Sequence, residues 1–113
     1  MQSLLAIADP TRRRIVELLA ERERTAGELV DEFDMSAPAI SQHLNVLREA
    51  GLVVTRAEGK SRIQSLNPDG LNELDAWLEK TRSIWSRRLD ALERELRAED
   101  EAAARKAKKK SRT

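Results

Sequence analysis

The segment between Thr25 and Gly51 constrains the fold most, because it holds two short helix patterns separated by only a few residues. Thr25 and Glu28 have the spacing of a capping box, in which the two side chains satisfy free backbone amides at the start of a helix. Ser36 is a typical N-cap for a second helix, and Gly51 stands where that helix should end. A short link forces two helices to cross steeply, which predicts a helix-turn-helix.

Each of these two helices has one apolar face, because its apolar residues recur at helical spacing. The first face consists of Ala26, Leu29, Val30 and Phe33, and the second of Ile40, Leu44 and Leu47. The polar residues Ser41, Gln42 and Asn45 lie on the opposite side of the second helix. We therefore expect that helix to present a hydroxyl and two amides to solvent.

A β-hairpin is predicted after the second helix. Leu52 to Ala57 is short, partly alternating and rich in β-branched residues, Glu58 to Lys60 forms a turn, and Ser61 to Leu66 gives a second strand. The hairpin carries the cations Arg56, Lys60 and Arg62. The predicted fold is therefore mainly α with a small β-hairpin: a winged helix-turn-helix.

Two further helices precede and one follows this unit. Leu4, Leu5 and Ala8 indicate a short first helix, and Asp9-Pro10 is an N-cap followed by proline at the first helical position. Asn67-Pro68 opens a last helix that could run to about Ala98. Its apolar residues follow a near-heptad seam, which is typical of a dimer stripe. The predicted dimer interface contains Leu4, Leu5, Leu74, Trp77, Leu78, Trp85, Leu89 and Leu92.

Composition limits the remaining classes of protein. The 113 residues suit one domain, assigned to residues 1–98, and a basic, disordered tail at 99–113. From residue 101 onward there are six basic residues and one acidic residue, whereas residues 1–100 carry a net charge of −4. The absence of cysteine excludes disulfides and thiolate metal sites and suits a cytoplasmic protein. No signal peptide or membrane span is expected.

The exposed helix has the properties of a DNA-reading element. A single α-helix fits the major groove of DNA, and the amides of Gln42 and Asn45 can each pair with adenine. Arg48 lies a turn further along, suited to phosphate or guanine. The hairpin cations suit phosphates or the minor groove. The alternative interpretation of this polar face is an ordinary solvated helix surface.

Two motifs resemble the ArsR-type repressors. Residues 6–15 read AIADPTRRRI, close to the family's LADPTRRRIL opening, and residues 36–53 read SAPAISQHLNVLREAGLV, similar to its recognition-helix signature. The resemblance implies a homodimeric repressor, built on the first and last helices, that binds double-stranded DNA at a palindromic operator. The DNA contacts are then expected at Ser36, Ala39, Ser41, Gln42, His43, Asn45 and Arg48, and at Arg12, Arg56, Lys60 and Arg62.

The departures from that family pattern concern its metal sites. The cysteine pair of the metal-sensing branch is replaced by Thr25 and Gly27, and the last helix has no histidine. Gln64 stands where the wing often carries an aromatic residue. The sequence therefore resembles the metal-independent branch, with no metal and no cofactor, and it assigns no small-molecule effector.

Several residues have a second interpretation. His43 suits a packed, hydrogen-bonded role better than a catalytic one, although a DNA-backbone contact stays open. Trp77 and Trp85 suit a dimer stripe better than a ligand pocket. The acidic third helix leaves open a protein-interaction module that has lost DNA binding. An enzyme is disfavoured, because no catalytic constellation is visible.

Overall fold

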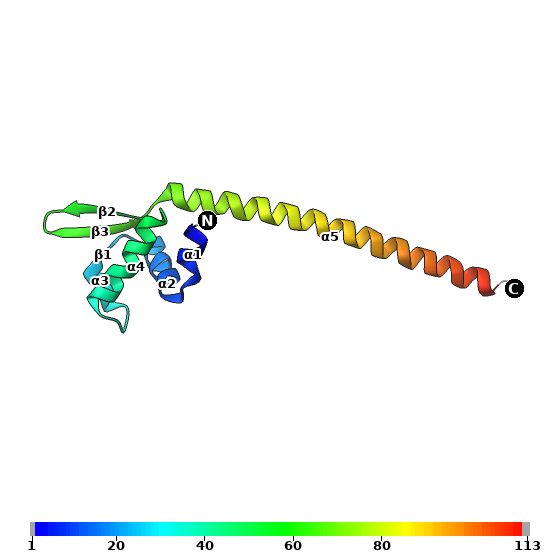
Figure 1. Ribbon diagram of the computed structural model, residues 1–113, viewed down its shortest axis with the longest axis horizontal. Coiled ribbons are helices and arrows are strands. Elements are labelled where there is room, and N and C mark those ends of the chain that lie inside the picture. Colours follow the sequence, from blue (N-terminus) through cyan, green and yellow to red (C-terminus); the bar gives the residue numbers. More distant parts are fainter. Residues whose placement is uncertain (1, 112–113) are drawn as a thin grey trace. The chain divides into compact units, whose positions relative to one another are not determined.

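The computed structural model describes residues 2–111 and divides into two units between Ala76 and Trp77 (Figure 1). The helices are α1 (Gln2–Ala8), α2 (Pro10–Glu21), α3 (Ala26–Asp31), α4 (Ala37–Glu49) and α5 (Pro68–Ser111), and the strands are β1 (Arg24–Thr25), β2 (Val53–Glu58) and β3 (Ser61–Leu66). The mainly helical winged fold predicted from the sequence is confirmed.

Three helices of the first unit begin at the predicted caps. The Asp9 carboxylate accepts a hydrogen bond from the Arg12 amide at 3.1 Å, and the Ser36 hydroxyl accepts one from the Ala39 amide at 3.3 Å. Thr25 makes both halves of the capping box with Glu28. These bonds satisfy amides that have no partner inside the helix, so they fix where each helix starts.

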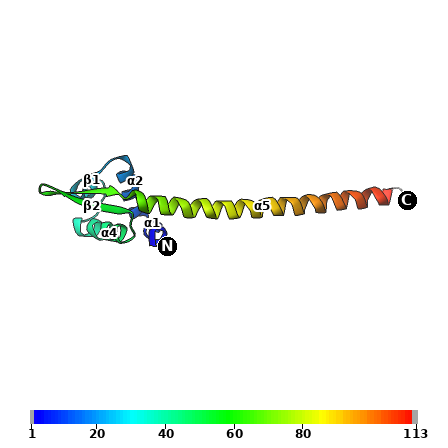
Figure 2. The same ribbon diagram turned by 90° about the horizontal axis from the view of Figure 1, so that it is seen from above.

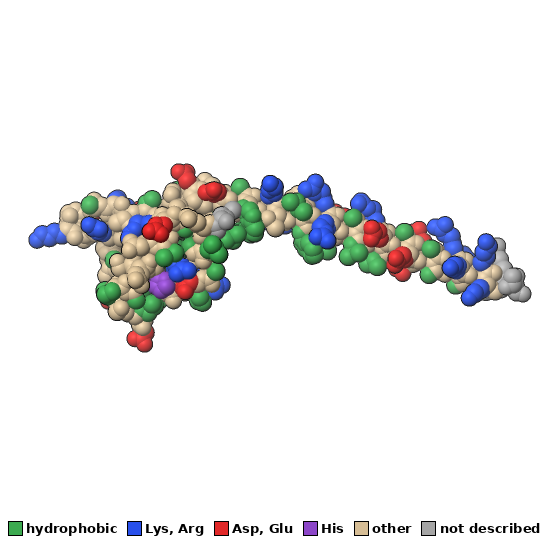
Figure 3. All heavy atoms as spheres, viewed as in Figure 1, with side chains coloured by type: hydrophobic (Ala, Val, Ile, Leu, Met, Phe, Trp, Pro, Cys, Tyr) green, Lys and Arg blue, Asp and Glu red, His purple; other side chains and the backbone are tan. Residues whose placement is uncertain are grey.

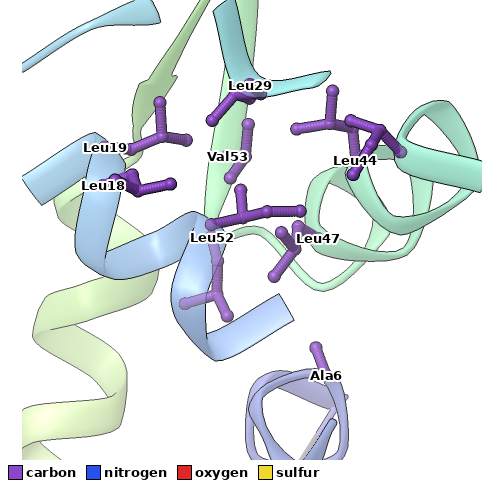
Figure 4. Packing of buried hydrophobic residues seen from close by; sticks show 10 residues of the cluster. Ala6, Leu18, Leu19, Leu29, Leu44, Leu47, Leu52 and Val53 are labelled. Atoms are coloured by element: carbon purple, nitrogen blue, oxygen red, sulfur yellow. The ribbon is translucent and has the colours of Figure 1, made fainter. Parts of the chain in front are cut away.

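The core of the first unit gathers apolar side chains from every helix of that unit. Figure 4 shows them converging from α1, α2, α3, α4 and the start of β2. Helices α2, α3 and α4 supply most of this cluster, and those of its members in α3 and α4 lie at predicted apolar positions. The cluster comprises Ala6, Ile15, Leu18, Leu19, Leu29, Ile40, Leu44, Leu47, Leu52 and Val53. Only one face of α4, that of Ile40, Leu44 and Leu47, packs into this cluster.

The β-sheet has one strand more than predicted. Its order is β1-β3-β2, with all pairs antiparallel, and Thr55 lies opposite Gln64 in the hairpin. The added strand β1 pairs Arg24 with Gln64, and its two residues are too few to show any periodicity in the sequence. Beyond this sheet the hairpin tip extends past the helices of its unit in both views (Figures 1 and 2).

Helix α5 continues further than expected. The segment from residue 99 to Ser111 is helical, which corrects the prediction of a disordered tail, although residues 112 and 113 of that tail lie outside the described part. Alanine, lysine, arginine and glutamate are strong helix formers, and Glu101 pairs with Arg105 one turn on at 3.6 Å. No helix among residues 2–111 is both long and apolar enough to cross a membrane.

Gly70 is the position in α5 at which a larger residue cannot fit. A Cβ there would overlap the Gly51 carbonyl oxygen and lie 2.8 Å from the Gly51 carbonyl carbon. In α3, a Cβ at Gly27 would meet only the Thr25 hydroxyl, at 3.9 Å. Close packing therefore requires glycine at position 70, whereas the space around Gly27 admits a methyl group.

We predict different effects on stability for two glycine-to-alanine substitutions. Gly70→Ala should lower the free energy of unfolding by about 1–3 kcal/mol, because backbone must move to admit the methyl group. Gly27→Ala should leave it unchanged or raise it by up to about 1 kcal/mol, since alanine is the better helix former. Urea unfolding of both variants checks this, and a stabilised Gly70→Ala protein would contradict the packing described.

Candidate nucleic-acid interface

Helices α3 and α4 form the helix-turn-helix, with residues 32–36 as the link. Ile40, Leu44 and Leu47 are buried, and they fix the rotation of α4 about its axis. That rotation leaves Ser41, Gln42 and Asn45 exposed together on the outer face. Neither Ser41 nor Gln42 is among the hydrogen-bonded side chains of residues 2–111, so both can serve an external partner.

The start of α4 uses two of the predicted contact residues for its own structure. The exposed Ser36 hydroxyl accepts the Ala39 amide, so this oxygen is committed to the helix N-terminus. Ala39 is half-buried, and its methyl group adds little bulk to the first turn of α4. Both residues lie at the N-terminal end of α4.

Arg12 and His43 meet where α4 packs against the preceding helices. The Arg12 Nε donates to the Ala6 carbonyl at 2.6 Å, at the end of α1. Its Nη1 lies 3.4 Å from His43 Nδ1. Both side chains are half-buried, so Arg12 joins α1 and α2 to the recognition helix and His43 has the packed, hydrogen-bonded environment considered from the sequence.

Arg48 has its guanidinium directed into the first unit. Its Nη1 donates to Thr55 Oγ1 at 2.9 Å and to Gln64 Oε1 at 3.2 Å, while Nη2 donates to Asn45 Oδ1. Thr55 also donates to Gln64, at 2.6 Å. The residue predicted as a phosphate or guanine contact therefore connects α4 to both strands of the hairpin.

The three hairpin cations differ in their surroundings. Arg56 pairs with Glu23 at 2.6 Å and with Glu58 at 3.2 Å. The hydrogen bond to Glu23 is the main cause that raises the pKa of the Arg56 guanidinium above its ordinary value. Lys60 and Arg62 are exposed and take part in none of the ion pairs of residues 2–111, and basic side chains mark the hairpin tip in Figure 3.

The buried environment of two polar residues near the site was not predicted. Gln64 is only 1% exposed, yet it accepts hydrogen bonds from Arg48 and Thr55. Arg24 is also buried, and it donates to the Leu18 carbonyl at 3.2 Å and to Glu21 at 3.1 Å. The one signal available in the sequence was the amide of Gln64 at a wing position that is often aromatic.

The residues predicted to form a dimer interface are distributed over both units. In the first unit Leu5 is 72% exposed, whereas Leu4 and Leu74 are half-buried. In the second unit the large apolar side chains from Trp77 to Leu96 are each 38–56% exposed. Hydrophobic side chains follow one side of this helix in Figure 3. Among residues 2–111, no group of three or more histidine, cysteine, aspartate or glutamate side chains could hold a metal ion.

Comparison with known proteins places these features in one family. The profile described as "Bacterial regulatory protein, arsR family" matches residues 9–55, which span α2 to the middle of β2. The HTH-type transcriptional regulator Rv2034 of Mycobacterium tuberculosis is 45% identical over 84 residues, which cover 74% of this chain and 76% of that protein. The transcriptional repressor SdpR of Bacillus subtilis is 40% identical over 73 residues, covering 65% and 81%.

A solved structure agrees with the fold. The homodimeric winged helix-turn-helix DNA-binding domain Mb0332 from Mycobacterium bovis is 26% identical, with a TM-score of 0.60, over 73% of this chain and 76% of that domain.

Asp9 gives the site a predicted pH dependence. The hydrogen bond from the Arg12 amide is the main cause that lowers the pKa of the Asp9 carboxyl below its ordinary value of 3.8. A depressed pKa stabilises the fold above the unfolded-state pKa, and this contribution is lost as the pH falls through the folded-state pKa. Asp9→Ala should therefore cost about 1 kcal/mol at pH 7 and progressively less below pH 3.8.

Thermal unfolding of both proteins from pH 7 to pH 2.5 measures this difference. Using the difference between the two proteins removes the effect of the other carboxylates. A gap that stays constant over the whole range would show that the carboxylate charge contributes nothing to the cap.

Proposed function

The chain belongs to the arsR family of bacterial regulatory proteins, and on that basis we propose that it is a homodimeric repressor that reads a palindromic operator with α4. The wing holds the DNA backbone through Lys60 and Arg62. The protein acts in the cytoplasm as a regulator, not an enzyme, and without a metal.

The exposed outer face of α4 carries this proposal. Ser41 and Gln42 project from a helix whose opposite face is anchored in the core, so the side chains that reach a groove need no rearrangement. The Gln42 amide offers one donor and one acceptor, which match the N7 and N6 groups of adenine in the major groove. Sequence reading is therefore assigned first to Gln42.

Homodimerisation is supported by the apolar side of α5. A lone helix that exposes Trp77, Leu78, Ile84, Trp85, Leu89, Leu92 and Leu96 leaves more apolar surface in water than a soluble monomer normally does. Covering it with a second copy stabilises both chains, and the similar domain Mb0332 is a homodimer. A twofold dimer presents two α4 helices to successive major grooves, about 34–36 Å apart, and so requires a palindromic site.

Residue chemistry supports the metal-independent part of the proposal. At the positions matched to the family's cysteine pair, the Thr25 hydroxyl is used in the capping box and Gly27 has no side chain. DNA affinity should therefore be the same with and without a chelator.

The alternative of a protein-interaction module rested on the acidic α3 region, and ion pairs weaken it. Glu28 pairs with Arg22 at 2.8 Å, and Glu32 pairs with Arg24 at 3.6 Å. The side-chain hydrogen bond from Arg22 is the main cause that lowers the pKa of Glu28. The acidic residues of this region are Glu28, Asp31, Glu32 and Asp34. Because two of these four carboxylates already have a cationic partner inside the protein, the surface is less acidic than its composition indicates.

We predict that Gln42→Ala and Arg62→Ala separate base reading from backbone binding. Gln42→Ala should weaken binding to a selected operator by about 1–3 kcal/mol and leave random DNA unaffected. Arg62→Ala should weaken both and reduce the dependence of log Kd on log salt by about one. Titration of labelled duplexes at three salt concentrations checks this, and equal losses for Gln42→Ala on both DNAs would refute base reading by α4.

We also predict that one face of α5 controls assembly. Leu89→Glu should weaken the dimer at least about tenfold, because it places a charge in the apolar stripe. Arg94→Glu, on the opposite side of the same helix, is the matched control and should leave assembly unchanged. Sedimentation equilibrium over a range of concentrations measures both, and a Leu89→Glu protein as dimeric as the control would contradict the interface.

A further inference from the structure

The polar network around Arg48 determines more than the position of the wing. Its two terminal nitrogens bind three oxygens: Thr55 Oγ1 at 2.9 Å and Gln64 Oε1 at 3.2 Å from Nη1, and Asn45 Oδ1 from Nη2. The Arg48 side chain is half-buried, and Gln64 beneath it is almost fully buried. The buried part of the network holds one geometry, because the Gln64 oxygen would lose its partners if its bonds to Arg48 and Thr55 were broken.

This network orients the amide of Asn45. A guanidinium has five N–H donors and no acceptor, so the Asn45 atom that faces Arg48 must be the oxygen. The Nδ2 amide with its two N–H donors has no partner among the hydrogen bonds of residues 2–111, and Asn45 as a residue is exposed. The side chain that reaches the groove therefore offers donors, while its acceptor is already engaged by a cation.

We propose that Arg48 is a positioning residue that makes Asn45 a hydrogen-bond donor and thereby directs it to guanine. This inference rests on the proposed function of α4. In the major groove guanine presents two neighbouring acceptors, N7 and O6, whereas adenine presents an acceptor beside a donor. An amide whose oxygen is held by Arg48 matches guanine through its NH₂ donors. Its paired contact with adenine is weaker than that of a free asparagine, because one lone pair of the oxygen is occupied and the oxygen is fixed toward Arg48.

The proposal also explains why one helix carries two amides with different surroundings. Gln42 is exposed and has no such neighbour among the hydrogen bonds of residues 2–111, so both of its amide groups are available. Asn45 lies one turn away from it and is held by Arg48. Two amides on one face thus read different bases, and the difference is fixed by a residue that does not itself touch the base.

Selection from a pool of randomised duplexes tests the inference with the full-length protein. The position read by Asn45 is identified as the one whose preference disappears in Asn45→Ala. In the wild-type protein that position should favour guanine over adenine by roughly tenfold. In Arg48→Met, which keeps the length of the side chain but removes its donors, this ratio should fall to about one, while the position lost in Gln42→Ala keeps its preference.

Three results would overturn the inference. The first is an adenine preference at the Asn45 position in the wild-type protein, which needs no variant to fold. The second is an unchanged guanine preference in an Arg48→Met protein that unfolds at the same temperature as wild type. The third is a uniform loss of affinity in Arg48→Met with a salt dependence reduced by about one, which would make Arg48 a phosphate contact.

The same experiment separates this inference from the proposed function. If the wild-type protein enriches no sequence at all, α4 does not read DNA and the proposed function fails. If it enriches a palindrome without guanine at the Asn45 position, the proposed function stands and the role of Arg48 is refuted. Thr55→Val is a second probe: it removes one acceptor from the network, so it should loosen the preference at the Asn45 position and no other.

Discussion

The burial of one face of α4 is the constraint on which the site depends. Ile40, Leu44 and Leu47 pack into the apolar cluster that also contains residues of α2, α3 and β2. Successive residues of an α-helix are rotated by about 100° around its axis. Rotating α4 by a single residue would expose an isoleucine or leucine and turn Gln42 toward the protein. The cost of exposing one such side chain, about 1.5–3 kcal/mol, holds the outer face in place.

Arginines provide a second level of order around this helix. Arg12 connects it to the end of α1, through His43 Nδ1 and the Ala6 carbonyl, and Arg48 connects it to the hairpin through Thr55 Oγ1. Arg56 is neutralised by two glutamates. Three arginines that were predicted to contact DNA, Arg12, Arg48 and Arg56, therefore have partners within the protein. Among the hairpin cations, Lys60 and Arg62 remain available to bind the DNA backbone.

Local signals explain what the sequence predicts well. Caps at Asp9, Thr25 and Ser36, helical spacing of apolar residues and a glycine turn each act within a few residues, so their outcome can be derived without the fold. Strand β1 and the Arg48 network depend on contacts between segments far apart in the chain, and no local pattern records them. The tail is helical to Ser111 although it lacks apolar periodicity, because its alanine, lysine, arginine and glutamate residues favour a helix without a packing partner.

Side-chain amide signals in an NMR titration test the central claim most directly. We predict that the NH₂ resonances of Gln42 and Asn45 shift on adding a selected operator duplex but not a scrambled one of equal length. Those of Asn67 and Asn72, which lie outside α4, should stay in place with both duplexes. If Gln42 and Asn45 do not respond and the changes are confined to the wing with either duplex, α4 does not read DNA and the account is wrong.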